Sequence, residues 1–291
     1  MSTGGLRVAV VGHVEWVTFA RVPHLPGPGE IVHAADVFEV PAGGGPVAAV
    51  QLLKLAGNCT FFTALADDQL GHRSKLELEA MGVRVEVMFR PEAQRRAFTH
   101  VDASTGERTI TVMGPRLGPH GSDPLPWDEL AEADAVYFCA GNDEALVLAR
   151  RAKVLVATSR EAERLARVGV RLDAVVGSGR DPSERYVDID PAPALVVETL
   201  GAEGGRFRTG DGTAGEYAAA KLSGPVVCAY GAGDSFAAGL TYALGAGFSN
   251  DEALEFASRC GAAQLSGRGP YEGQLRAGDL SGPSRERPPG A

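Results

Sequence analysis

Residues 230–236 read YGAGDSF, a stretch in which small residues stand directly before an acidic one. Apolar residues then recur at a spacing of about four, which predicts a helix that begins inside the stretch. The first turn of a helix has unpaired amide groups and the positive end of the helix dipole, so it favours an anion. Gly231, Ala232 and Gly233 leave this backbone open to a phosphate group. The sequence therefore predicts an anion hole formed by these three residues.

Asp234 follows the small residues and would lie beside a phosphate bound there. Like charges repel, so a carboxylate at this position is poorly suited to binding the phosphate itself. It is suited to accepting the proton of an attacking hydroxyl while the amides hold the charge that develops on the phosphoryl group. The alternative interpretation is an ordinary helix cap, because glycine and aspartate also favour helix N-termini.

Composition excludes several other classes of protein. The chain has 291 residues, which is enough for one large α/β domain or two small ones, and its net charge is -9. An acidic balance without a basic strip argues against nucleic acid or an anionic membrane as a partner. We see no apolar run of membrane-spanning length and no signal segment, which predicts a cytoplasmic protein. The four cysteines are widely spaced, so we expect buried reduced thiols rather than a disulfide framework or a zinc site.

Short apolar runs alternate with helical patterns along most of the chain. The predicted strands cover residues 8–11, 60–64, 135–139, 154–157, 174–176 and 195–199. The predicted helices cover residues 46–56, 69–81, 144–151 and 161–168, and a capping box at Ser249 and Glu252 begins another helix. This alternation predicts an α/β fold with a mostly parallel central sheet flanked by helices.

Residues 16–40 and 97–112 break this rhythm, because they contain β-type segments with no helix between them. They predict a small inserted β-sheet that covers the carboxyl ends of the central strands, where open α/β sheets bind ligands. A lid of this kind keeps water away from a phosphoryl group during transfer. We assign residues 1–12, 41–94 and 115–280 to a nucleotide-binding α/β core, 13–40 and 95–114 to the lid, and 281–291 to a disordered tail.

Five segments between about residues 7 and 273 resemble the ribokinase-like carbohydrate kinases, often called PfkB sugar kinases. They are Gly12 with Leu25-Pro26 and Pro28-Gly29-Glu30, Gly43-Gly44 with Ala56-Gly57, Asp67-Asp68 with Gly71, Thr199-Leu200-Gly201 with Gly204, and Gly231 to Phe236. The last segment is the most specific.

The resemblance implies a ribokinase-like fold and transfer of the γ-phosphoryl group of ATP to a hydroxyl, with Mg²⁺. It implies that Asp234 is the catalytic base and that Gly231, Ala232 and Gly233 hold the phosphoryl group. It also places Thr199, Gly201 and Gly204 around the nucleotide, and Gly43 and Gly44 against the sugar. Adjacent glycines suit the last role, since a Cβ atom would block contact between the backbone and a polyol.

Two positions on the acceptor side depart from the family pattern. Val17 stands where the family usually has an aspartate that contacts sugar hydroxyls, and Ala48 stands where it has an asparagine. An apolar pair cannot satisfy those hydroxyls. We therefore expect an acceptor side lined by Val17 and Ala48 to admit smaller or less polar alcohols in competition with polyols. Glu15, His13 and Asp68 are candidates for replacement contacts.

Two further departures lie on the phosphate side. Cys228 replaces the acidic residue before the anion hole, and a thiol cannot orient a hydrated Mg²⁺ in the same way. Asp181 stands where the family has a glutamate, so the resemblance implies a nucleotide-side role through an outer-sphere metal contact. No residue is assigned as a direct metal ligand.

We expect an ATP-dependent kinase that acts on an alcohol group of a small molecule such as a sugar, because Asp234 and its anion hole are intact. A nucleoside kinase is one alternative. A nucleotide-binding or metabolite-binding protein with weak or no kinase activity is another, because Val17, Ala48 and Cys228 all depart from the pattern. The resemblance and the exposed edges of the lid predict a homodimer that pairs through the lid.

Overall fold

The computed structural model describes residues 5–280 and contains a nine-stranded sheet with a four-stranded sheet beside it. The large sheet has the order β13-β12-β11-β10-β9-β8-β1-β4-β5. Its seven strands from β11 to β5 are parallel, and β12 and β13 add antiparallel pairs at one edge. The mostly parallel sheet predicted from the sequence is confirmed.

The strands of the large sheet are β1 (Val8–Val11), β4 (Thr60–Ala66), β5 (Arg84–Arg90), β8 (Ala135–Phe138), β9 (Val154–Thr158), β10 (Ala174–Ser178), β11 (Leu195–Thr199), β12 (Gly205–Thr209) and β13 (Ala214–Tyr217). Six of the nine match the predicted runs, with ends that differ by at most two residues. The sequence analysis did not predict β5, β12 or β13.

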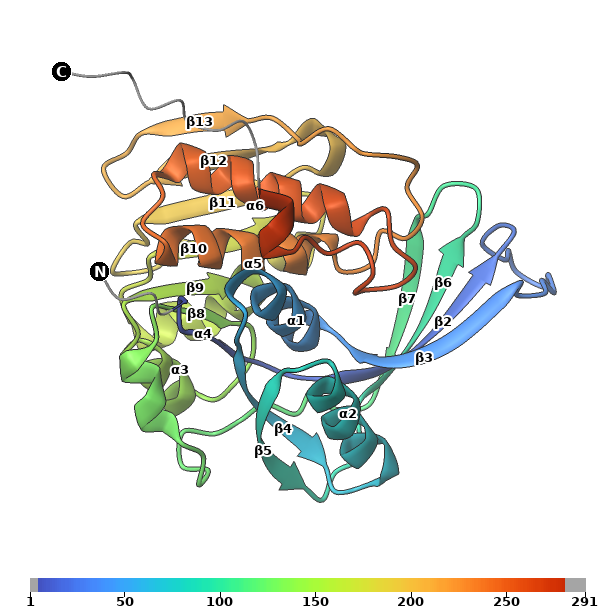
Figure 1. The fold of residues 1–291 in the computed structure, drawn as a ribbon, viewed down its shortest axis with the longest axis horizontal. Coiled ribbons are helices and arrows are strands. Elements are labelled where there is room, and N and C mark those ends of the chain that lie inside the picture. The colour runs from blue at the N-terminus through green and yellow to red at the C-terminus, as the bar shows by residue number, and fades with distance from the viewer. Residues whose placement is uncertain (1–4, 281–291) are drawn as a thin grey trace.

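Helices cover both faces of this sheet, as Figure 1 shows. The α-helices are α1 (Gly44–Ala56), α2 (Gln69–Ala80), α3 (Asp143–Ala149), α4 (Ala162–Val168), α5 (Ala232–Gly245) and α6 (Asn250–Gln264). The short 3-10 helices are η1 (Trp127–Glu132), η2 (Ser159–Glu161), η3 (Pro182–Glu184), η4 (Gly201–Glu203) and η5 (Ala277–Leu280). Helices α1, α2, α5 and α6 pack on one face, and α3, α4 and η1 pack on the other, so each face has its own apolar core.

The four-stranded sheet extends from one side of the large sheet, at the right of Figure 1. Its strands are β2 (Glu15–Val22), β3 (Asp36–Ala42), β6 (Arg96–Asp102) and β7 (Arg108–Met113), in the order β3-β2-β6-β7. They come from the two stretches that were predicted to form an inserted sheet, although β3 runs two residues past the predicted boundary at residue 40. We call this sheet the lid.

Two local predictions are also confirmed. Ser249 and Glu252 form the capping box that begins α6. All four cysteines are buried free thiols. Among residues 5–280, no helix is long and apolar enough to cross a membrane. The tail predicted at residues 281–291 lies outside the described residues.

Candidate active site

The start of α5, where the sequence predicts an anion hole, lies beside the end of β8, because Asp234 and Cys139 both approach Gly44. Gly231 caps the helix with φ of 81°, a left-handed conformation that favours glycine. A Cβ atom on Gly231 would also lie 2.9 Å from Cγ1 of Val47 in α1. Gly233 is exposed, and nothing lies within 4 Å of the position a Cβ atom would take. At Gly233 the backbone of the first turn of α5 is therefore open, as an anion hole would require.

Asp234 lies in this first turn and is half-buried. Burial raises its pKa to about 6, and the negative charge of Glu184 acts in the same direction, whereas Arg160 and Arg108 oppose the shift. Its carboxylate has no hydrogen bond or ion pair within residues 5–280. A carboxylate with a pKa near neutrality and no partner is free to take a proton from a ligand.

The first turn of α1 faces Asp234. A Cβ atom on Gly44 would lie 3.1 Å from Oδ1 of Asp234, so this glycine leaves the carboxylate room. Gly43 caps α1 with φ of 89°, and its amide donates to the hydroxyl oxygen of Tyr230 at 3.0 Å. Tyr230 directly precedes the anion-hole stretch, so this bond links the N-termini of α1 and α5. The structure thus brings Gly43, Gly44 and Asp234 together.

A buried polar cluster borders the same glycines. Cγ of Glu15 lies 3.2 Å from the position of a Cβ atom on Gly43. Arg95 donates to Glu15 at 2.8 Å, and Nε2 of His13 lies 3.7 Å from the same carboxylate. Burial raises the pKa of Glu15, but His13 and Arg95 outweigh burial and lower it overall. Burial lowers the pKa of His13, and its Nδ1 atom has no hydrogen-bond partner. Of the three proposed replacement contacts, His13 and Glu15 therefore lie near Asp234.

The predicted nucleotide-side residues form a second group at the ends of β10 and β11. Thr199 ends β11, and its carbonyl accepts from the amide of Gly179 at 2.9 Å. Gly201 and Gly204 both have positive φ, and a Cβ atom on Gly204 would lie 2.0 Å from the carbonyl oxygen of Tyr217. Gly204 is therefore required by the packing of its own turn, whatever else it contacts.

Asp181 belongs to this second group, but its carboxylate is already bound by other groups of the protein. It caps η3 through the amide of Ser183 and forms an ion pair with Arg160 at 2.7 Å. Arg160 also pairs with Glu184 at 2.6 Å. Glu184 in turn accepts from the amide of Ser178 at 2.7 Å. These contacts join the nucleotide-side group to the surroundings of Asp234, because both Arg160 and Glu184 influence the pKa of Asp234.

Sequence reasoning missed Tyr230, Arg160, Glu184 and Arg108 as neighbours of the site. Tyr230 is the first residue of the stretch at 230–236, and Glu184 stands three residues beyond Asp181, so proximity in sequence was a usable signal for both. For Arg160 and Arg108 no such signal exists, because they come from other segments of the chain.

Three predicted contact residues are placed differently by the structure. Val17 and Ala48 are both fully buried, Val17 in the apolar cluster under the lid and Ala48 in the core beside α5. Neither side chain reaches a surface that a ligand could contact, which corrects the expectation that they line the acceptor side. Asp68 caps α2 and accepts from the amides of Gly71 and Gln94, so its oxygens hold the local backbone. Cys228 is buried beneath the lid as well.

Mg²⁺ would need oxygen ligands from the acidic residues around the site. Within residues 5–280, no group of three or more histidine, cysteine, aspartate or glutamate side chains could hold a metal ion. Mg²⁺ keeps several waters and is usually held by one or two carboxylates together with substrate phosphates. Asp181 and Glu184 supply two carboxylates in the nucleotide-side group, and both are paired with Arg160. This donor set fits a metal carried mainly by a nucleotide and contacted through water.

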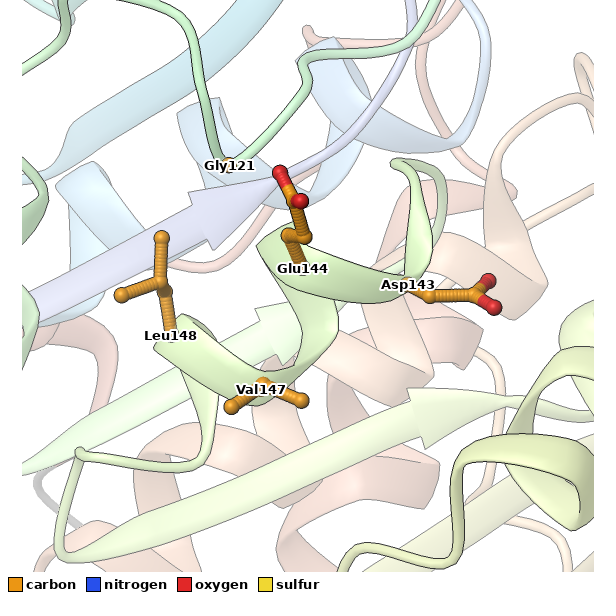
Figure 2. Close-up of a pocket in the computed structure, with 5 residues that line it drawn as sticks. All are labelled: Gly121, Asp143, Glu144, Val147 and Leu148. Atoms are coloured by element: carbon orange, nitrogen blue, oxygen red, sulfur yellow. The ribbon is translucent and has the colours of Figure 1, made fainter.

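A shallow hollow on the surface of α3 contains none of the predicted site residues, as Figure 2 shows. It is lined by Gly121, Asp143, Glu144, Val147 and Leu148. Gly121 packs against Glu144, and Asp143 is paired with Arg164 of α4 at 2.6 Å. The charged groups that line this hollow contribute to the packing of α3, so we do not place the active site there.

The geometry around Asp234 is that of a phosphotransferase: an unpartnered base beside two helix N-termini, bordered by glycines that leave room for ligands. Comparison with known proteins supports this interpretation. Residues 6–185 and 148–276 match the model of the pfkB family carbohydrate kinases. An ATP-dependent ribose-1-phosphate kinase from Halopiger xanaduensis is 27% identical over 276 residues, which cover 88% of this chain and 91% of that protein.

Solved structures show the same fold. Ribokinase from Giardia lamblia has a TM-score of 0.75 at 16% identity, covering 94% of this chain and 97% of that chain. Ribokinase from Cryptococcus neoformans in complex with ADP has a TM-score of 0.72 at 21% identity, covering 94% and 98%. The chain therefore belongs to the pfkB family of carbohydrate kinases. It is an ATP-dependent phosphotransferase with an alcohol group as acceptor.

Proposed function

We propose that this kinase phosphorylates a hydroxyl of a pentose that already carries a phosphate group, with ribose 1-phosphate as the first candidate. The kinase reaction rests on one observation, the unpartnered carboxylate of Asp234 with its pKa of about 6 at the start of α5. The choice of acceptor is supported by similarity to the ribose-1-phosphate kinase from Halopiger xanaduensis. The burial of Val17 and Ala48 removes the reason to expect small apolar alcohols.

In this proposal the acceptor lies between the first turn of α1 and Asp234. Its hydroxyl gives up a proton to the carboxylate of Asp234 as its oxygen attacks the γ-phosphorus of ATP, the bond from that phosphorus to the β–γ bridging oxygen breaks, and ADP leaves. The amides of Gly231, Ala232 and Gly233 stabilise the charge on the transferring group. Because Tyr230 accepts from the amide of Gly43, the acceptor side and the anion hole are held in a fixed relation.

The nucleotide then binds beside the nucleotide-side residues at the ends of β10 and β11. Thr199, Gly201 and Gly204 would lie along the ATP, with Asp181 beside them. Mg²⁺ would bind the phosphates of ATP and partly neutralise their charge, with Asp181 and Glu184 in contact through water. Arg160 lies between these two carboxylates, so it limits how far they repel the nucleotide.

An acceptor screen tests the proposed function. Purified protein with ATP and Mg²⁺ should convert ribose 1-phosphate to a bisphosphate with a kcat/KM at least about tenfold above that for ribose or adenosine, within the usual range for enzymes. Product formation would be followed by ³¹P NMR. A strong preference for adenosine would favour the nucleoside kinase instead. ATP binding by calorimetry without any product would favour a binding protein.

We also propose that two copies pair through their lids. Strand β7 is an outer strand of the lid, and all its residues are exposed. The exposed side chain of Met113 lies opposite Arg96, on the face of the lid that points away from the site, and leaves apolar surface that a second copy would cover. Light scattering coupled to gel filtration should give about twice the chain mass. Met113→Glu should shift the protein towards the monomer, whereas Leu76→Glu on α2 should not, and a monomeric wild type would contradict the pairing.

A further inference from the structure

One face of the lid points towards the site, and the strand register shows which residues it carries. Val17 of β2 lies opposite Ala97 of β6, and both are buried in the apolar cluster that contains Tyr230. Alternate residues of a strand share a face, so Val101 lies on this face too, and Val101 lies opposite Arg108 of β7. Arg108 is therefore on the inward face of the lid.

Arg108 is the cation near Asp234 that has no partner within residues 5–280. The other arginines around the site are already engaged, Arg21 with the carbonyls of Ala103 and Val227 and the rest with carboxylates. Arg95 pairs with Glu15 at 2.8 Å, Arg116 pairs with Glu161, and Arg160 pairs with Asp181 at 2.7 Å. Arg108 is exposed, and its positive charge lowers the pKa of both Asp234 and Cys228 against the effect of burial. Its guanidinium thus lies near the anion-hole stretch with its donors free.

The position of Arg108 is fixed relative to the anion hole. The turn before β7 docks on the loop that leads into α5, where the carbonyl of Gly106 accepts from the amide of Ala229 at 2.9 Å. Gly106 has φ of 72°, and a Cβ atom there would lie 2.7 Å from Cγ1 of Val226. Arg21 adds a bond from the lid to the carbonyl of Val227 at 3.3 Å. A side chain two residues from this docking point does not need a large lid movement to act at the site.

We propose that Arg108 binds the phosphate group of the acceptor, a role that rests on the proposed function. Its planar guanidinium matches a phosphate with two parallel hydrogen bonds. Its strand follows the turn that docks on the loop leading into α5, whereas the predicted nucleotide residues lie at the end of β11 on the core. A phosphorylated sugar brings negative charge close to Glu15, Glu184 and Asp234, so it needs an uncommitted cation of this kind.

The test is Arg108→Gln, assayed with ribose 1-phosphate and with unphosphorylated ribose. We expect the KM for ribose 1-phosphate to rise about 10- to 30-fold, which is the effect of losing a charge-assisted hydrogen bond. The KM values for ribose and for ATP should stay within about twofold. Arg108→Lys should recover part of the loss. Arg96→Gln is the matched control, because Arg96 is exposed one strand away on the outward face of the lid.

The competing outcomes are distinct. If kcat fell equally with both acceptors while both KM values held, Arg108 would contact the transferring phosphoryl group, and the proposal would be overturned. Calorimetric binding of ribose 1-phosphate without ATP separates this inference from the proposed function. Weaker binding in the variant than in the wild type would support Arg108 even without turnover. Absence of binding to the wild type, or equal binding by both proteins, would overturn it.

Discussion

Replacing Asp234 with asparagine should lower kcat by about 10²- to 10⁴-fold, the usual contribution of a general base. Asparagine has nearly the same shape and keeps the first turn of α5, but its amide cannot accept a proton. The backbone donors of the anion hole remain, so the affinity for ATP should stay within about twofold. Steady-state kinetics with ribose 1-phosphate, together with calorimetric titration of ATP with Mg²⁺, would measure both quantities.

Asp251→Asn provides the matched control, since Asp251 is an exposed acidic residue in the first turn of α6. That variant should keep the wild-type kcat. If Asp234→Asn also kept it, the assignment of the base would be refuted. If ATP affinity fell together with kcat, Asp234 would be acting on the nucleotide rather than on the acceptor hydroxyl.

The Asp234→Asn substitution should lower activity but raise the stability of the folded protein at high pH. Burial raises the folded-state pKa of Asp234 to about 6 from an ordinary value of 3.8, so the folded protein binds this proton more tightly than the unfolded chain does. The resulting stability is present below pH 3.8 and is lost as the pH rises through about 6. At pH 8, Asp234→Asn should therefore be more stable than the wild type by about 1–2 kcal/mol, after allowance for partial exposure. Urea unfolding at pH 8 would measure this difference, and a less stable variant would contradict the burial argument.

Local patterns were enough to predict the elements that carry the site. The strands β1 and β11 and the start of α5 follow from short apolar runs and from one glycine-rich turn. Two of the three unpredicted strands have weaker signals, because β12 and β13 form an exposed antiparallel edge in which polar and charged residues alternate with a few apolar ones. Such strands are stabilised by their pairing partners, which the local sequence does not specify.

The surroundings of Asp234 depend on contacts between distant parts of the chain. Gly43 and Tyr230 are 187 residues apart, yet their hydrogen bond links the two helix N-termini. Arg108 reaches the site through a lid strand whose register decides which face it occupies. Val17 and Ala48 show a second limit of the sequence. A family pattern marks a position as a ligand contact, but it does not say whether a different side chain at that position still contacts the ligand. Here the smaller and apolar side chains pack into the core instead.

Replacing Gly44 with alanine should lower kcat/KM for the acceptor by about 100-fold without harming the fold. The added methyl carbon would lie 3.1 Å from Oδ1 of Asp234 and 3.7 Å from Sγ of Cys139. It would occupy the space that an acceptor hydroxyl needs beside the base, and displacement of about 1 Å costs on the order of 10² in rate. Gly44 is the first residue of α1 and has no positive φ, so alanine should leave helix stability equal or slightly higher.

The combination of lost activity and retained stability is what makes Gly44→Ala informative. The KM for ATP should remain within about twofold, because α1 borders the proposed acceptor site and not the predicted nucleotide residues. Gly224→Ala serves as the control, since nothing lies within 4 Å of the Cβ position at Gly224. Thermal unfolding of both variants would separate a blocked site from a damaged one. Wild-type kcat/KM in Gly44→Ala would mean that the acceptor does not approach Asp234 past the first turn of α1, and the acceptor side would then have to be placed elsewhere around the base.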